Sequence, residues 1–150
     1  MIQRVERATL HLVDQGGDRH AHAAIGPGLV VLLGIAATDT DADAKWISGK
    51  VAHLRVFEDA DQKMNLGPLD LEPPGQVLVV PNFTVAGNAH KGRRPDFTGA
   101  MKPPRAGVLF ERVCELVEAE GIATARGVFG GDMRVELVND GPVTIVIESP

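Results

Sequence analysis

Polar groups that could stabilise an oxyanion follow a short buried strand. Residues 77–80 form a continuous apolar run, and Pro81, Asn82, Phe83 and Thr84 come directly after it. Proline gives a sheet ladder no N–H, so the strand should leave the sheet here and expose the Asn82 carboxamide, the Thr84 hydroxyl and free backbone N–H groups. On this segment alone, an edge strand with two polar surface residues is the simpler interpretation.

A second candidate lies near the end of the chain, in residues 138–144. Apolar and polar residues alternate on both sides of Asn139-Asp140-Gly141, which is the pattern of strands. Residues of these types close tight turns, so a hairpin is the simplest interpretation. Pro142 complicates it, because proline donates no N–H and the bond before it can be cis. Gly141 and Pro142 would then present two carbonyls side by side, as a rigid acceptor pair for an amine.

Basic residues cluster in one loop of an otherwise acidic chain, whose net charge is −5. The cluster consists of His90, Lys91, Arg93 and Arg94 around Gly92. A solvated loop is the default interpretation, and a loop that contacts phosphates is the functional one. The net charge argues against broad non-specific nucleic-acid binding, but it allows a local patch that meets one defined RNA.

Other common chemistries are not indicated, and we expect neither a metal nor a cofactor. His11, His20 and His22 lie near one another, but no Cys, Asp or Glu completes a familiar ligand spacing. The acids around residues 59–61 lack the central Gly and bidentate Glu of a calcium loop. The single cysteine, Cys114, falls in an amphipathic pattern and should be a buried thiol. The sequence also has no phosphate-binding Gly-rich loop, no nucleophile elbow and no Cys/His nucleophile pair.

The elements that position these residues follow from periodicity. The chain has 150 residues, 44% of them hydrophobic, which fits one domain with a real core over residues 1–150. A helix should begin after Thr40, whose capping box includes Asp43, and a second one after Pro103-Pro104. Strands are predicted over residues 8–12, 20–25, 29–35, 55–58, 77–80, 122–128, 133–137 and 143–147. Charges near the N-terminus argue against a signal peptide, and no apolar stretch approaches membrane-spanning length, so we expect a soluble cytoplasmic protein.

Several short segments, in this order and spacing, resemble the D-aminoacyl-tRNA deacylases, formerly called D-tyrosyl-tRNA deacylases. They are Gln3–Val5, Gly26–Leu29, Arg55–Asp59, Lys63–Asn65, Phe83–Thr84, Lys91–Ala100 and Val138–Thr144. The resemblance spans nearly the whole chain. It implies a mixed α/β fold with a strongly curved, mostly antiparallel, barrel-like sheet and two main helices. It also implies a homodimer with sites at the subunit interface, and hydrolysis of the ester that links a D-amino acid to the tRNA 3′ end, with no membrane or DNA partner.

The resemblance assigns roles to individual residues. In relatives, the Gly-Pro bond is cis and the pair enters the partner's pocket, where its carbonyls hold the substrate amino group and leave no space for an L side chain. The matching pair here is Gly141 and Pro142, and Arg4 matches an arginine that steadies their loop, although alone it reads as a surface charge. Such a backbone sieve should also admit glycyl-tRNA mischarged on tRNA(Ala), because glycine has no side chain to reject. Further substrate contacts are expected from Pro81, Phe129 and Met133, and tRNA contacts from Lys91, Arg93 and Arg94.

The sequence departs from relatives at the strand end, where they usually carry Ser-Gln-Phe-Thr. Here Pro81 removes a hydroxyl and an N–H, and Asn82 carries its amide on a shorter stem. Thr84 has no adjacent base to activate it, so we favour assistance by the 2′-hydroxyl of the terminal adenosine, with Asn82 and the N–H groups of Phe83 and Thr84 receiving the developing charge.

Three hypotheses therefore stay open at the level of sequence. The first is an active D-aminoacyl-tRNA deacylase, and the second is a paralogue of shifted specificity. A related branch that clears L-alanine from the wrong tRNA has proline before the amide residue and a trans Gly-Pro bond. The third is a tRNA-binding protein without catalysis.

Overall fold

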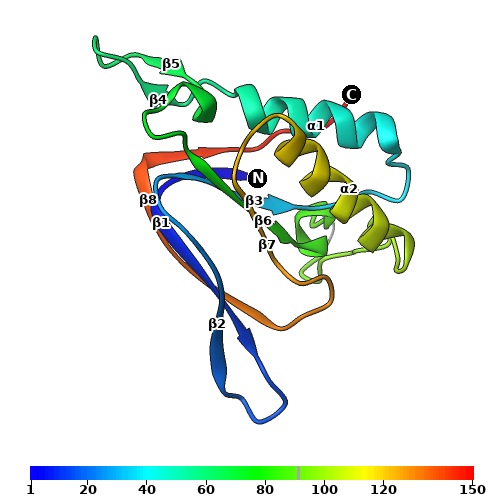
Figure 1. Ribbon diagram of the computed structural model, residues 1–150. Coiled ribbons are helices and arrows are strands. Elements are labelled where there is room, and N and C mark those ends of the chain that lie inside the picture. The colour runs from blue at the N-terminus through cyan, green and yellow to red at the C-terminus, as the bar shows by residue number, and fades with distance from the viewer. Residues whose placement is uncertain (91) are drawn as a thin grey trace.

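The computed structural model describes residues 1–90 and 92–150 as a mixed α/β structure (Figure 1). The predicted basic residue Lys91 lies outside the described residues. The elements are, in order, β1 (Ile2–Val13), β2 (Arg19–Ile25), β3 (Gly28–Leu33), α1 (Asp41–His53), β4 (Phe57–Glu58), β5 (Met64–Leu66), the 3₁₀ helix η1 (Pro68–Asp70), β6 (Gln76–Pro81), the 3₁₀ helix η2 (Phe83–Ala86), α2 (Arg105–Ala119), β7 (Thr124–Arg126) and β8 (Met133–Ile145).

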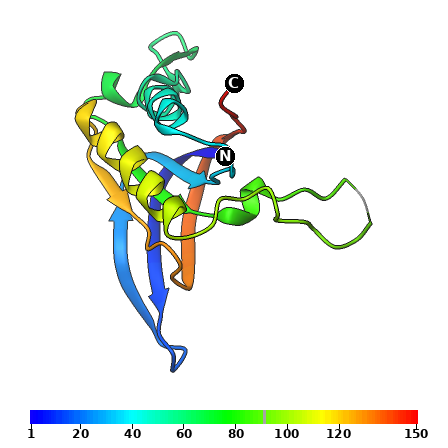
Figure 2. The ribbon, with the colours of Figure 1, turned by 90° about the vertical axis from the view of Figure 1, so that its right-hand side faces the viewer.

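A six-stranded sheet in the order β2-β1-β3-β6-β7, with β8 also paired to β1, forms the body. β1 is antiparallel to its three neighbours, whereas β6 is parallel to β3 and β7. β2 and β3 pair with successive parts of β1, and the chain bends between them at Gly26 and Pro27. The sheet curves into a nearly closed, barrel-like shape, and α1 and α2 lie together on one side of it (Figure 2). The fold class that the resemblance implied is confirmed.

The strands beside the site are held by burial on both faces, as their continuous apolar sequence predicted. Leu29, Val31 and Val79 pack in the core under the helices, together with Phe110 of α2. Val30, Leu78 and Val80 alternate with them along the strands and pack in a second core on the other face of the sheet. β3 and β6 run parallel from Gly28↔Gln76 to Leu33↔Pro81. They approach so closely that a Cβ on Gly28 would lie 1.9 Å from the Gln76 carbonyl oxygen, so only glycine fits there.

Both predicted helices are present, and α1 begins with the predicted capping box. The Asp43 carboxylate accepts from the Thr40 N–H at 2.8 Å, and the Thr40 hydroxyl oxygen accepts from the Ala42 N–H at 3.3 Å. α2 carries the apolar stripe that packs onto the sheet, and Cys114 is buried in it as predicted. No helix in the described part of the chain is long and apolar enough to cross a membrane.

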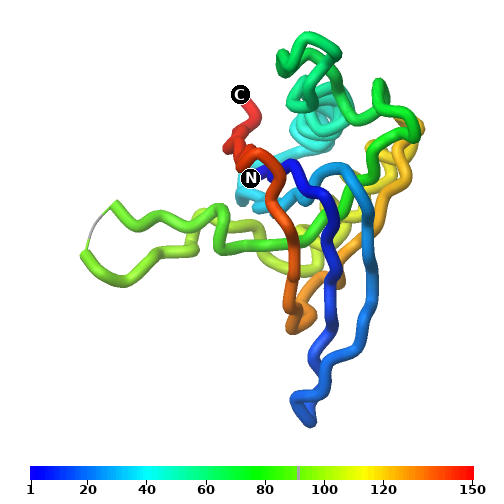
Figure 3. Tube along the Cα trace, turned by 90° about the vertical axis from the view of Figure 1, so that its left-hand side faces the viewer, coloured from blue at the N-terminus to red at the C-terminus, as the bar shows by residue number. Residues whose placement is uncertain are grey.

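The predicted hairpin over residues 133–147 is wrong. β8 is a single strand that pairs antiparallel with β1 on both sides of the expected turn, from Leu12↔Met133 to Ile2↔Ile145, and Figure 3 shows the two running side by side. The register jumps from Val5↔Asn139 to Gln3↔Thr144, so residues 140–143 face Arg4 alone. Asp140, Gly141, Pro142 and Val143 therefore form a long bulge in one strand. Asp, Gly and Pro suit a bulge as well as they suit a chain reversal.

Candidate functional site

A cavity of about 680 Å³ opens where β6 ends, beside the first part of β8. The residues that line it are Leu32, Val80, Pro81, Asn82, Phe83, Thr84, Gly130, Gly131, Asp132, Met133, Val135 and Leu137. The structure thus brings the predicted strand-end residues 81–84, which include the predicted substrate contact Pro81, together with a second predicted contact, Met133. The remaining apolar wall from β3 and β8 was not predicted, since only the tertiary pairing places these strands beside β6.

Asn82 shapes the rim of this cavity. Its N–H donates to the Leu33 carbonyl at 2.8 Å, which is the last sheet-like bond before the chain turns into η2. Its side-chain oxygen then accepts from the Thr84 N–H at 3.1 Å and from the Thr84 hydroxyl. Asn82 therefore caps η2, as a short polar side chain can at a helix start. The prediction that the strand leaves the sheet at Pro81-Asn82 is confirmed.

The cap determines which donors at the cavity rim are already hydrogen-bonded. The Thr84 N–H and hydroxyl are both engaged with the Asn82 oxygen, so neither is free to bind an oxyanion in this arrangement. Among the described residues, the Asn82 Nδ2 has no hydrogen-bond partner and stays available as a donor. A carboxamide oxygen is also a very poor proton acceptor, so the Thr84 hydroxyl lacks the adjacent base that a nucleophile needs.

Phe129 is placed differently from the expectation. In the described part of the chain it is not among the residues that line the cavity, although its neighbours Gly130 and Gly131 are. Its ring instead packs 6.4 Å from the ring of Phe110, over Gly107 of α2. Phe129 therefore anchors the loop that carries the cavity wall onto the helix.

Gly127 is a residue of the site region that sequence reasoning missed. A Cβ at this position would lie 2.8 Å from Cδ of Pro81 and 3.1 Å from Sδ of Met133. The chain after β7 therefore approaches the end of β6 so closely that only glycine fits. A glycine inside the predicted strand over residues 122–128 was the only signal in the sequence.

Arg4 is buried, and the interpretation as a surface charge is wrong. Its side chain is only 6% exposed, with Nε 2.9 Å from the Asp140 carboxylate and Nη1 donating to the Val56 carbonyl at 2.7 Å. Glu58 lies farther away, at 3.8 Å. The guanidinium thus ties the bulge of β8 to the segment that leads into β4, with charge-assisted hydrogen bonds on both sides.

The bulge presents Gly141 and Pro142 to solvent. Gly141 has φ of +114°, a conformation that side chains disfavour, and the peptide bond to Pro142 is cis. A Cβ on Gly141 would lie 2.8 Å from Cγ2 of Val143 and 3.0 Å from Nη2 of Arg4. In the chain as described, these two residues do not line the cavity at Asn82. A single chain therefore does not unite the two predicted halves of the site.

The basic loop forms an arm that projects from the body directly after η2 (Figure 2). Asn88 and Asp96 close its base with two backbone hydrogen bonds of 2.8 Å. Arg93 and Arg94 are exposed on it. The rings of Phe83 and Phe97 meet edge to face at 5.2 Å where the arm joins the cavity rim, so the arm and the rim share one support.

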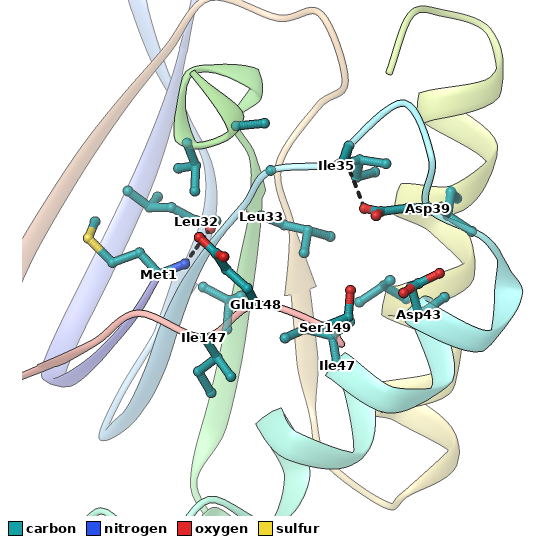
Figure 4. Close-up of a pocket in the computed structure, with 18 of the residues that line it drawn as sticks. Met1, Leu32, Leu33, Ile35, Asp39, Asp43, Ile47, Ile147, Glu148 and Ser149 are labelled. Atoms are coloured by element: carbon teal, nitrogen blue, oxygen red, sulfur yellow. Dashed lines mark hydrogen bonds between the residues drawn. The ribbon is translucent and has the colours of Figure 1, made fainter. Parts of the chain in front are cut away.

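A second cavity, of about 560 Å³, lies between the end of β3, α1 and the C-terminal segment (Figure 4). The Met1 ammonium donates to the Leu32 carbonyl at 3.0 Å, and burial lowers the pKa of this amine. The Asp39 carboxylate accepts from the Ala36 N–H at 2.8 Å, and Asp43 belongs to the α1 cap. These polar groups serve the fold. Cys114 is likewise inert, because burial raises the pKa of its thiol to about 12.

Comparison with known proteins gives a consistent result. The family model described as D-Tyr-tRNA(Tyr) deacylase matches residues 1–148. The chain is 49% identical to the D-aminoacyl-tRNA deacylase of Myxococcus xanthus, over 100% of this chain and 94% of the relative. It is 46% identical to the enzyme of the same name from Anaeromyxobacter dehalogenans, over 99% and 95% of the two chains.

Solved structures agree with the sequence relatives. The structure of a c-Myc DNA unwinding element binding protein matches with a TM-score of 0.87 and 36% identity, over 99% of this chain and 97% of that one. A probable eukaryotic D-amino acid tRNA deacylase matches with a TM-score of 0.75, over 93% and 92% of the two chains. At 18% identity, this second likeness shows the fold alone.

Replacing Arg4 should destabilise the protein. Arg4→Met keeps the apolar stem but leaves the buried Val56 carbonyl without its donor, so we expect the free energy of unfolding to fall by about 1–3 kcal/mol. The control is Arg7→Met on the same strand, where the side chain is 70% exposed and its Glu6 partner lies 3.8 Å away. That variant should stay within about 0.5 kcal/mol of the parent in urea denaturation. Equal effects of the two substitutions would contradict the structural role of Arg4.

Proposed function

Because this chain belongs to the D-Tyr-tRNA(Tyr) deacylase family, we propose that it hydrolyses the ester between a D-amino acid and the 3′ end of tRNA, releasing free tRNA and the D-amino acid. The observation that carries the proposal is the open cavity at the end of β6, where the Asn82 Nδ2 remains available beside an apolar wall. A donor at that position suits the charged carbonyl oxygen of a tetrahedral intermediate.

The proposed reaction uses no covalent enzyme intermediate. Water adds to the ester carbonyl carbon, assisted by the 2′-hydroxyl of the terminal adenosine, and the carbonyl oxygen becomes an oxyanion. The Asn82 Nδ2 and the Phe83 N–H stabilise this oxyanion. The bond between the carbonyl carbon and the 3′ oxygen then breaks, the 3′ oxygen takes a proton, and the amino acid leaves as a carboxylate. Thr84 contributes by holding the Asn82 oxygen, which points the amide nitrogen away from η2.

The chirality filter is proposed to come from a second copy of the chain. Gly141 and Pro142 are exposed and do not line the cavity of their own described chain, and Arg4 fixes the bulge that carries them. In a homodimer, each bulge would enter the partner's cavity, where its carbonyls bind the substrate amino group. The backbone then occupies the space of an L side chain and leaves that of a D side chain free. Glycine has no side chain to meet the backbone, so the filter admits it, and glycyl-tRNA(Ala) is a further substrate of the proposed enzyme.

The arm is the proposed tRNA contact. Arg93 and Arg94 are exposed on the arm that projects from the body after η2 (Figure 2), and in this proposal they contact the acceptor stem whose 3′ end reaches Asn82. Contacts of this kind position a nucleic acid without reading its sequence, which suits an enzyme that accepts many tRNAs. We place the protein in the cytoplasm, where aminoacyl-tRNAs are made and used.

Selective hydrolysis tests the proposed function directly. The purified protein, with a chelator present and uncatalysed decay subtracted, should deacylate D-tyrosyl-tRNA about a hundredfold or more faster than L-tyrosyl-tRNA. Glycyl-tRNA(Ala) should also be cleaved. Equal rates for the D and L esters would rule out the proposed chirality filter. Binding of tRNA without cleavage of any ester would identify a binding protein, and a preference for L-alanyl-tRNA would identify a paralogue of shifted specificity.

The role of Asn82 as a donor can be separated from its role as a cap. Asn82→Asp keeps the oxygen that caps η2 but replaces the amide donor with a negative charge, so the thermal stability should be retained. The kcat should fall by about 10²–10³-fold, as when one oxyanion donor is lost. Asn82→Ala should lose activity similarly and be less stable as well. The control Asn65→Asp makes the same charge change in β5 and should keep its kcat. A fully active Asn82→Asp enzyme would exclude the proposed donor.

Reversing the charge of the arm should weaken tRNA binding. With Arg93→Glu and Arg94→Glu combined, the affinity should fall and the slope of log affinity against log salt should become shallower by about 0.7–1 for each lost phosphate contact. The matched control combines Lys45→Glu and Lys50→Glu in α1, which changes the net charge equally, and it should behave like the parent. Identical salt dependence in all three proteins would show that the arm is solvated surface only.

A further inference from the structure

The bulge in β8 interrupts the ladder and removes backbone partners. Gln3 pairs with Thr144 and Val5 with Asn139, so Arg4 lies between them opposite residues that have left the strand. A carbonyl beside such a bulge loses its normal partner from the neighbouring strand. A partly buried carbonyl without a partner is costly, so something else must satisfy the groups on both sides.

The Asn139 carboxamide supplies both missing donors. Its Nδ2 donates to the Arg4 carbonyl at 2.9 Å and to the Val143 carbonyl at 3.0 Å. The Arg4 carbonyl lies on β1, and the Val143 carbonyl lies at the far end of the bulge. A single amide therefore joins the two ends of the bulge, the neck of this loop, and also ties the bulge to β1. The side chain is half-buried, where competition from water is reduced.

We propose that Asn139 is a positioning residue that sets the direction in which Gly141 and Pro142 leave the sheet; this inference rests on the proposed function. Arg4 holds the loop at a different place, through the Asp140 carboxylate at 2.9 Å and the Asp140 carbonyl at 3.3 Å. Arg4 therefore anchors the first residue of the bulge, and Asn139 joins its two ends. A loop held at both places can present its carbonyls in one orientation.

The geometry requires a carboxamide rather than any polar group. Two carbonyl oxygens face one nitrogen with two hydrogens, which matches the donors of an Asn side chain. An Asp at this position would set carboxylate oxygens against both carbonyls. A Ser hydroxyl has one hydrogen on a shorter stem and cannot bridge the neck. Asn139→Asp and Asn139→Ser therefore remove the two hydrogen bonds to the Arg4 and Val143 carbonyls in different ways.

The effect should be visible as lost discrimination. In the full-length protein, Asn139→Asp and Asn139→Ser should each lower the ratio of kcat/KM for D-tyrosyl-tRNA over L-tyrosyl-tRNA at least tenfold, with a raised KM for the D substrate. Asn139 does not line the cavity at Asn82, so the substitutions should leave the proposed oxyanion donors of Asn82 and Phe83 in place. The destabilised control is Val51→Ala, at a fully buried position of α1. It should lower the melting temperature and leave the D over L ratio unchanged.

The outcomes separate this inference from the proposed function. Should the parent protein fail to cleave D-tyrosyl-tRNA, the proposed function itself fails. If the parent is selective and a folded Asn139→Asp or Asn139→Ser enzyme keeps its D over L ratio, Asn139 has no positioning role. Should Asn139→Asp prove unstable, the milder Asn139→Ser decides between the two results. A ratio that falls equally in Val51→Ala would likewise overturn the inference, because general loosening would then explain it.

Discussion

A buried guanidinium organises the exposed part of the proposed site. Arg4 is almost inaccessible to solvent, and its charge is balanced by the Asp140 carboxylate at 2.9 Å. Because a buried charge without partners is very unfavourable, the segments that pair with Arg4 are drawn to it. The bulge of β8 and the segment before β4 are therefore fixed to β1 and to each other. The long β1 strand is the frame, and Arg4 is the point at which the bulge is anchored.

The local features of the fold were predictable from sequence, but the pairing of distant segments was not. The buried strands predicted at residues 29–35 and 77–80, the Thr40 cap and the exit of the chain at Pro81 each follow from neighbouring residues, although β3 ends at Leu33. The hairpin prediction failed because β8 finds its partner at the other end of the chain, in β1. The burial of Arg4 depends on the same pairing, and the position of Phe129 depends on packing against α2.

The unusual Pro81-Asn82 pair has a coherent local explanation. Proline at the end of β6 needs no ladder donor, because the strand stops there, and the next N–H makes the last bond to β3. The oxygen of the short Asn82 side chain accepts from the Thr84 N–H two residues later and caps η2, as N-cap residues typically do. The Asn82 oxygen is therefore engaged, whereas the nitrogen has no partner among the described residues. Asn82 therefore keeps an amide donor at the strand end while its oxygen caps η2.

In the proposed homodimer, one chain supplies the cavity and the other supplies Gly141 and Pro142. Mixed dimers of Asn82→Asp and Gly141→Ala subunits test it most directly, since one of their two sites combines a native cavity with a native bulge. With equal mixing, about half of the dimers are mixed and each has one native site. We predict that about a quarter of all sites are restored and that the D-tyrosyl-tRNA deacylation rate is about a quarter of the native rate. Activity no greater than that of the separate variants would contradict the claim, because a site contained within one chain cannot be repaired by mixing.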